Sequence, residues 1–141
     1  MSDSLYLVSC VSTKRASPSP ARDLYVSPLF VKARAFVEAR NAPWFILSAE
    51  YGLLDPNTVV APYERTLNRM RLAERRAWAD GVLAALGPRL RAVGTVVFLA
   101  GKRYREFLEP ALSGRVRVEV PMADLGIGKQ LQWLTLNLEP R

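Results

Sequence analysis

Histidine is absent from the 141 residues, and cysteine occurs only once. Without histidine the chain can form neither a Ser-His-Asp triad nor a Cys-His dyad. A single cysteine cannot supply the usual ligand set of a zinc site. Catalysis would therefore have to use carboxylates, lysine, tyrosine, the one cysteine or backbone donors. We expect a protein that holds no metal and no cofactor.

Long apolar runs are missing as well. No stretch approaches the roughly 18 continuous apolar residues of a membrane span. The first residues, Met1–Ser4, have neither the basic region nor the apolar segment of a secretion signal. One cysteine leaves no internal disulfide, which fits a reducing compartment. We therefore expect a soluble cytoplasmic protein that has no membrane partner.

Acidic residues are few compared with basic ones, 13 against 20, and the net charge is +7. Such an excess attracts polyanions, because basic side chains that contact phosphates release counterions from nucleic acid. Many basic residues lie between positions 65 and 117. The candidates for nucleic-acid contact are Arg65, Arg69, Arg71, Arg75, Arg76, Lys102 and Arg103. The alternative is compositional bias, because most of them are arginine, which genome composition alone can favour.

Apolar residues make up 50% of the chain, enough for the core of one domain over residues 1–141. Strand-like and helix-like patterns alternate along it. The expected strands cover residues 5–8, 44–47, 95–100 and 116–120, and the expected helices cover about 28–41, 72–90, 101–112 and 127–138. This order predicts an α/β domain with a mainly parallel sheet flanked by helices on both faces.

The first two expected strands are joined by a helix with Ser27 as its N-cap and Pro28 at its first position. The two strands of such a β-α-β unit run parallel. The loop after residue 8 and the segment after residue 47 should therefore leave the sheet at the same edge.

Residues 48–67 are the stretch richest in candidate functional groups. They follow an apolar strand and combine carboxylates with tyrosines, and Gly52 can adopt a positive φ. Open α/β sheets bind ligands beyond the carboxyl ends of their strands. The candidates from this segment are Ser48, Glu50, Tyr51, Tyr63 and Glu64. The alternative is a long structural connection with half-buried tyrosines.

The loop after the first strand adds Ser9, Cys10 and Lys14. It lacks the glycines of a P-loop, so a nucleoside triphosphate site is not expected. Hydroxyl groups and Lys14 can still hold a phosphate or a base edge, whereas the nearby prolines favour a mobile, solvated loop as the alternative. Cys10 is a candidate nucleophile without a histidine to activate it, and a packed or sensing thiol is its alternative.

The glycines of residues 121–130 precede the last expected helix. Backbone N–H groups at such a helix start can face an anion, and Gln130 can add a side-chain contact. Gly128 and Lys129 are therefore candidates for substrate binding. Close packing of the helix on the sheet is the alternative reason for the glycines.

The spacing Ser48-x-x-Tyr51-Gly52-Leu53-Leu54-x-Pro56, followed by Pro62-Tyr63 and Leu67, resembles the central motif of the YaaA peroxide-stress family. Ser9, Cys10 and Lys14 lie where that family carries a Ser-Pro-Ala-Lys-type turn. The resemblance implies DNA binding and protection of DNA under oxidative stress. More distantly, the same N-terminal loop resembles a domain of archaeosine synthase, which acts on a modified guanine base in tRNA.

Charge and resemblance together favour nucleic acid as the partner, DNA first and RNA as the alternative. The first hypothesis is a base-processing enzyme that, like a DNA glycosylase, acts at the N-glycosidic bond, which needs neither metal nor histidine. In it Glu50 is the carboxylate, Tyr51 and Tyr63 hold the base, and Lys14 is the cationic partner in one shared cavity. A non-catalytic DNA-binding protein of stress response or defence is the second hypothesis. A small-molecule enzyme for nucleoside-like substrates is the third.

Overall fold

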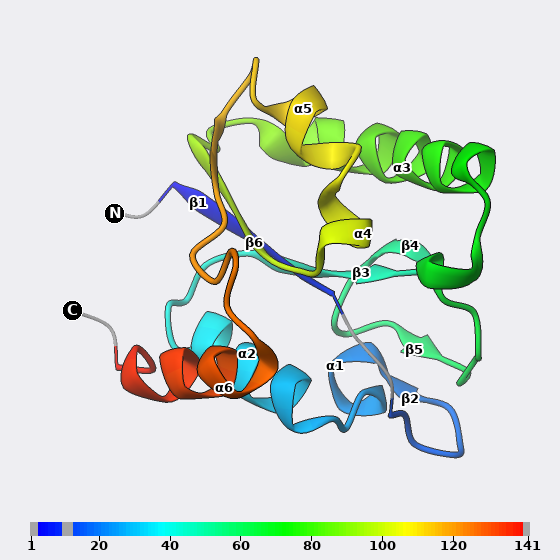
Figure 1. Ribbon diagram of the computed structural model, residues 1–141, viewed down its shortest axis with the longest axis vertical. Coiled ribbons are helices and arrows are strands. Elements are labelled where there is room, and N and C mark those ends of the chain that lie inside the picture. Colours follow the sequence, from blue (N-terminus) through cyan, green and yellow to red (C-terminus); the bar gives the residue numbers. More distant parts are fainter. Residues whose placement is uncertain (1–2, 10–12, 140–141) are drawn as a thin grey trace.

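The computed structural model describes residues 3–9 and 13–139 (Figure 1). Its central sheet has five strands in the order β4-β3-β1-β6-β7. Four of them run parallel, and β4 joins β3 in the antiparallel direction at one edge. The strands are β1 (Ser4–Ser9), β3 (Trp44–Ser48), β4 (Gly52–Leu54), β6 (Thr95–Leu99) and β7 (Arg117–Glu119). The prediction of an α/β domain with a mainly parallel sheet is confirmed.

The first β-α-β unit explains why two of the predicted loops emerge together. β1 pairs in parallel with β3, with Ser9 opposite Leu47. Between them α2 (Pro28–Glu38) begins as predicted, because the Ser27 hydroxyl accepts a hydrogen bond of 3.3 Å from the Phe30 N–H and caps the helix. Ser9 and Ser48 therefore end neighbouring strands at the same sheet edge.

The hydrophobic core has two parts, and β1 contributes to both with alternate side chains. Val8 belongs to a cluster with α1 (Ala21–Leu24), α2 and α6 (Ile127–Leu136). Leu5 and Leu7 belong to a second cluster with α3 (Leu72–Leu86) and α5 (Leu108–Leu112). This division follows from the two-residue period of a strand.

Two of the expected helices are shorter than the sequence suggests, and proline explains both. Pro110 has no N–H for the carbonyl of Glu106, and its ring clashes there. The expected helix 101–112 is accordingly split into α4 (Lys102–Arg105) and α5. Pro88 likewise ends α3, which continues only as a 3₁₀ turn, η2 (Gly87–Leu90). No helix in the described ranges is long and apolar enough to cross a membrane.

The segment after β3 contains structure that the sequence analysis did not predict. β4 forms a tight hairpin with β3, in which Ser48 pairs with Gly52, and Gly52 has a φ of 69°. Farther on, β5 (Val59–Val60) pairs in the antiparallel direction with β2 (Ser19–Pro20). A 3₁₀ turn, η1 (Leu67–Arg69), then leads to α3.

The last strand agrees with the alternation of its residues. β7 pairs with β6 at the end of the sheet, opposite the edge formed by β4. Val118 is half-buried, whereas Arg117 and Glu119 are exposed. The predicted half-exposed edge strand is therefore confirmed.

Candidate functional site

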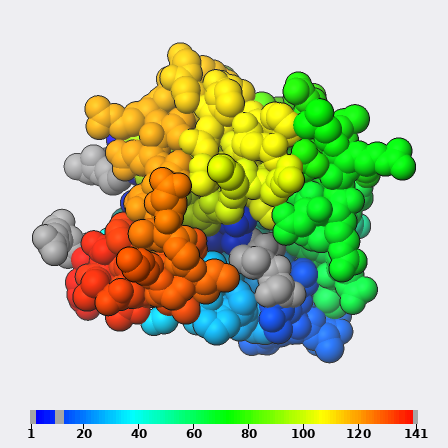
Figure 2. Space-filling view, in the orientation of Figure 1, coloured from blue at the N-terminus to red at the C-terminus, as the bar shows by residue number. Residues whose placement is uncertain are grey.

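A cavity of about 510 Å³ lies at the carboxyl ends of β1, β6 and β7. Open α/β sheets bind ligands at this edge, and ligand pockets commonly span about 300–1,000 Å³. Figure 2 shows the recess between the yellow surface of α4 and the orange and cyan surfaces of the 120s and α2. We call it the edge pocket, which is lined by Ser9, Leu29, Ala33, Asn68, Phe98–Arg105, Val120, Met122, Asp124, Leu125, Ile127 and Gln130.

The ends of β1 and β6 form the floor of the edge pocket and are joined by a hydrogen bond. The Gly101 N–H donates a hydrogen bond of 3.2 Å to the hydroxyl of Ser9, which is itself buried. Leu29 from α2 and Phe98 from β6 add apolar lining. The pocket therefore combines an apolar wall with polar groups, as small-molecule sites commonly do.

Three cations of α4 line the pocket, and they differ in how far nearby carboxylates neutralise them. Arg105 pairs with Glu109 at 2.7 Å and donates to the carbonyl of Ala100. Arg103 is more exposed and lies 3.6 Å from the carboxylate of Glu106. The ammonium group of Lys102 makes no hydrogen bond or ion pair with any other described residue. Lys102 is therefore the cation that remains available to a ligand.

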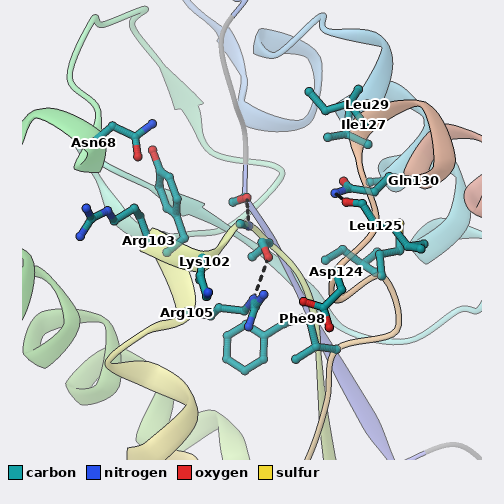
Figure 3. A pocket seen from close by; sticks show the side chains of 18 residues that line it. Leu29, Asn68, Phe98, Lys102, Arg103, Arg105, Asp124, Leu125, Ile127 and Gln130 are labelled. Carbon is teal, nitrogen blue, oxygen red and sulfur yellow. Dashed lines mark hydrogen bonds between the residues drawn. The ribbon is translucent and has the colours of Figure 1, made fainter.

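The loop between β7 and α6 supplies the opposite wall. Figure 3 shows Asp124 and Gln130 entering from this side, across the pocket from Lys102 and Arg103. Asp124 has a left-handed φ of 67°, which aspartate adopts more readily than most residues. Within the described part of the chain its carboxylate has no hydrogen bond or ion pair. The Gln130 amide donates 2.7 Å to the carbonyl of Leu125, which leaves its oxygen as an acceptor.

A second polar group, which we call the tyrosine cluster, contains Lys14, Tyr25, Ser48, Tyr51 and Tyr63. The fully buried Ser48 hydroxyl accepts from the Tyr51 N–H at 3.0 Å and donates to the Tyr63 hydroxyl at 2.9 Å. Tyr63 also shares a 2.8 Å hydrogen bond with Tyr25, and the Tyr51 hydroxyl donates to the backbone. The Lys14 ammonium lies 4.5 Å from the centre of the Tyr63 ring. Four candidates from the sequence therefore lie together: the hydroxyls of Ser48, Tyr51 and Tyr63 are used in internal hydrogen bonds, and Lys14 contacts the Tyr63 ring.

Glu50 lies beside this cluster but points to the surface. It occupies the tip of the β3–β4 hairpin, a position that exposes its side chain. Its carboxylate is 3.7 Å from the guanidinium group of Arg65, and both side chains are about half exposed. No described hydrogen bond or ion pair joins it to Lys14. Glu64 is also exposed, and neither carboxylate lines the edge pocket.

The arginines singled out by charge divide into two kinds. Arg75 is structural: its Nε lies 3.3 Å from the Glu106 carboxylate, and another of its nitrogens donates 2.7 Å to the carbonyl of Met70. Arg76 stacks 4.9 Å over the ring of Phe107.

By contrast, Arg69 and Arg71 are exposed at η1, which packs against α4. We call Arg69, Arg71, Lys102 and Arg103 the basic rim.

Three other candidates contribute less to the described geometry. Gly128 and Lys129 are exposed at the start of α6, and the pocket is lined by their neighbours Ile127 and Gln130 instead. Cys10 lies outside the described residues. Across the ranges that the structure describes, no three Cys, Asp or Glu side chains gather to form a metal site.

Sequence reasoning did not single out Asn68, Arg105 or Asp124 as site residues, although all three line the pocket. Asp124 had one usable signal, because an aspartate between a strand and a glycine-rich helix start is well suited to a left-handed turn. Asn68 had none, since it reaches the pocket only through the 3₁₀ turn η1.

Comparison with known proteins gives a family without an assigned activity. The family described as "Family of unknown function (DUF6884)" matches residues 5–136. A curated relative, "Uncharacterized protein YfjM" of Bacillus subtilis (strain 168), is 25% identical over an alignment of 139 residues. The match covers 89% of this chain and 85% of the relative. Neither description names a ligand or a reaction. The family match spans both the edge pocket and the tyrosine cluster.

Proposed function

Because the chain belongs to this family of unknown function, we propose a function from its own side chains: the protein binds nucleic acid and processes one of its bases. In this proposal the basic rim contacts phosphates, and the edge pocket receives an extruded base. The observation that carries it is a 510 Å³ cavity with unneutralised Lys102 on its wall and exposed arginines beside it. Enzymes that act on a base take it out of the stack into such a pocket.

Electrostatics supports nucleic acid as the partner. The chain carries a net charge of +7, and the side chains of Arg69, Arg71 and Lys102 form no ion pair within the described residues. Cations at the mouth of a cleft raise the local concentration of an anionic ligand and form phosphate contacts. DNA is the proposed partner, and RNA is the alternative polymer that the binding test includes.

The proposed reaction is hydrolysis of the N-glycosidic bond. The oxygen of a water molecule bonds to C1′ while the C1′–N bond breaks, its electron pair passes to the base, and the base leaves with a proton. A carboxylate can take the proton of the water or stabilise positive charge on the sugar. Asp124 lines the pocket, whereas Glu50 lies at a hairpin tip. The geometry therefore favours Asp124 over Glu50 as the carboxylate that contacts the base in the pocket.

A non-catalytic nucleic-acid-binding protein of stress response or defence is the second candidate. The observation that favours it is that Glu50 is exposed and ion-paired. Residues 48–67, which resemble the YaaA motif, therefore place no carboxylate in the edge pocket. The same basic rim would serve this function.

Two broader features belong to the proposal. We infer a cytoplasmic location, because a single cysteine suits a reducing compartment. We also infer that helices cover both faces of the sheet, an arrangement that the two hydrophobic clusters support.

The binding step is tested by fluorescence anisotropy with labelled single-stranded DNA, duplex DNA and RNA at several salt concentrations. We expect a log–log salt slope near −0.9 per phosphate contact on duplex DNA, reduced by the double change Arg69→Gln and Arg71→Gln. The matched control, Arg115→Gln with Arg117→Gln, removes the same charge from the start of β7, away from the pocket. No binding at low salt, or equal losses in both double variants, would contradict the proposal.

The chemical step is tested by incubating the protein with DNA that carries damaged or modified bases and scoring abasic sites. We expect Asp124→Asn to lose about 10²-fold or more of the activity and Glu50→Gln to retain it. If Glu50→Gln loses the activity and Asp124→Asn keeps it, Glu50 is the carboxylate that the reaction uses. Binding without release of any base would favour the second candidate.

A further inference from the structure

The edge pocket holds two opposite charges that do not neutralise each other. Lys102 extends from α4, and Asp124 extends from the loop between β7 and α6. They line one cavity from different sides (Figure 3), yet they form no ion pair with each other or with any other described residue. The other two charged side chains that line the pocket are paired, Arg103 with Glu106 and Arg105 with Glu109. A ligand with complementary groups at both ends would satisfy both.

The wall around Asp124 presents hydrogen-bond acceptors. An ionised carboxylate only accepts. The Gln130 side chain donates one of its two amide N–H groups to the carbonyl of Leu125, and its oxygen remains an acceptor for a ligand. In the same pocket the partly exposed Leu125 and Leu29 offer apolar surface for a flat ring. A ring that lies here must direct N–H donors toward Asp124.

From these two observations we infer that the edge pocket selects nucleotides whose base carries an exocyclic amino group. The phosphate lies at Lys102, and the amino group donates to Asp124. Thymine and uracil are disfavoured, because the carbonyl oxygens on either side of their single ring N–H would face acceptors. This inference rests on the proposed function, since it specifies which nucleotide unit of a nucleic acid enters the pocket.

The test is isothermal titration calorimetry of the full chain with dAMP, dCMP, dTMP, deoxyadenosine and inorganic phosphate. Hydrogen bonds to charged groups contribute about 1.5–3 kcal/mol, equivalent to roughly tenfold or more in affinity. We expect dAMP and dCMP to bind at least about tenfold more tightly than dTMP. We expect dAMP to exceed deoxyadenosine by a similar factor.

The two charges should be separable by mutation. Lys102→Gln should remove the advantage of dAMP over deoxyadenosine and keep the preference for dCMP over dTMP. Asp124→Asn should remove the base preference and keep the advantage conferred by the phosphate. Asp124→Gly, which suits the left-handed backbone, should behave like Asp124→Asn. Lys129→Gln is the control, because this exposed lysine does not line the pocket.

The outcomes distinguish this inference from the function on which it rests. If DNA binds but the mononucleotides do not, or bind without preference, the inference is wrong and the proposed function stands. If neither DNA nor mononucleotide binds, both fail. If Lys102→Gln and Asp124→Asn weaken every nucleotide equally, the division of roles between the two residues is wrong.

Discussion

The tyrosine cluster and the edge pocket lie beyond the carboxyl ends of neighbouring strands, but they treat polar groups differently. In the cluster, the Ser48 hydroxyl makes two hydrogen bonds and Tyr63 contacts two other hydroxyl groups. In the pocket, the side chains of Lys102 and Asp124 make no hydrogen bond or ion pair within the described part of the chain. Paired polar groups stabilise a fold, whereas unpaired ones beside a cavity are available to a ligand.

The difference shows that a segment rich in functional side chains can use them to hold its own fold together. The segment around β4 carries more tyrosine and carboxylate than the pocket does. Its hydroxyls nevertheless secure the β3–β4 hairpin, and the indole N–H of Trp78 donates 2.9 Å to the Ser48 carbonyl. We therefore expect mutations in the cluster to alter stability and mutations in the pocket to alter binding.

The largest expected effect concerns the ion pair behind the pocket wall. Glu106→Ala leaves the largely buried Arg75 without its carboxylate. Removing one partner of a fully buried pair costs about 3–5 kcal/mol, and because these side chains keep some exposure we expect about 2–3 kcal/mol in urea unfolding. Glu50→Ala, which breaks the exposed pair with Arg65, should change stability by no more than about 1 kcal/mol. Equal losses in the two variants would remove the distinction between the pairs.

The next effect concerns Ser48 in the tyrosine cluster. Ser48→Ala removes a buried hydroxyl that joins Tyr51 to Tyr63, and we expect a loss of about 1–2 kcal/mol in the free energy of unfolding. Tyr51→Phe, which removes an exposed hydroxyl, should cost less. DNA affinity should stay unchanged in both variants. If Ser48→Ala kept full stability but weakened DNA binding, the tyrosine cluster and not the edge pocket would be the binding site.

A smaller effect concerns pH and the pair formed by Asp23 and Arg34. A hydrogen bond from Arg34 lowers the pKa of Asp23 below its ordinary value, and the charge of Arg34 adds to it, against the opposing effect of burial. The pair therefore stabilises the fold above about pH 4, where the unfolded aspartate is ionised, and this contribution is lost as the pH falls through the lowered pKa. Because both groups are about one-third exposed, we expect less than about 1 kcal/mol.

The measurement for this pair is urea unfolding of the wild type and Asp23→Asn across pH 2–7. The two proteins should differ most near neutral pH and converge at the acid end. A difference that grows as the pH falls would contradict the sign of the effect.

The smallest expected effect on stability belongs to the pocket. Lys102→Gln removes a charge without a described partner, so we expect a change within about 0.5 kcal/mol in the free energy of unfolding. The measurement is again urea unfolding at neutral pH. A loss of 2 kcal/mol or more would show that Lys102 is a structural cation.

The fold was predicted correctly where capping residues and hydrophobic periodicity indicate the same helix or strand. Ser27 and Pro28 mark the start of α2, and the β-α-β order predicts the parallel pairing of β1 and β3. The prediction failed where a proline cannot bond to the carbonyl four residues earlier. Pro110 in this way separates α4 from α5. The β3–β4 hairpin was missed because its three-residue loop, 49–51, does not resemble the common two-residue turns.

The candidate site was predicted at the level of the sheet edge but only in part at the level of residues. Ser9, Lys102 and Arg103 line the pocket because Ser9 ends β1 and the two cations open α4. Asp124 was overlooked because its carboxylate reaches the pocket through one left-handed backbone angle, which no hydrophobic period encodes. Arg75 is paired with Glu106, a partner from the turn between α4 and α5 that a charge count cannot reveal.

The most direct test of the account is an NMR titration of the ¹⁵N-labelled protein with a short single-stranded DNA at low salt. The account predicts that the largest amide shifts fall in residues 99–105 and 122–130, which line or adjoin the edge pocket, and that residues 48–65 shift little. The largest shifts in residues 48–65, or no shifts anywhere, would contradict it.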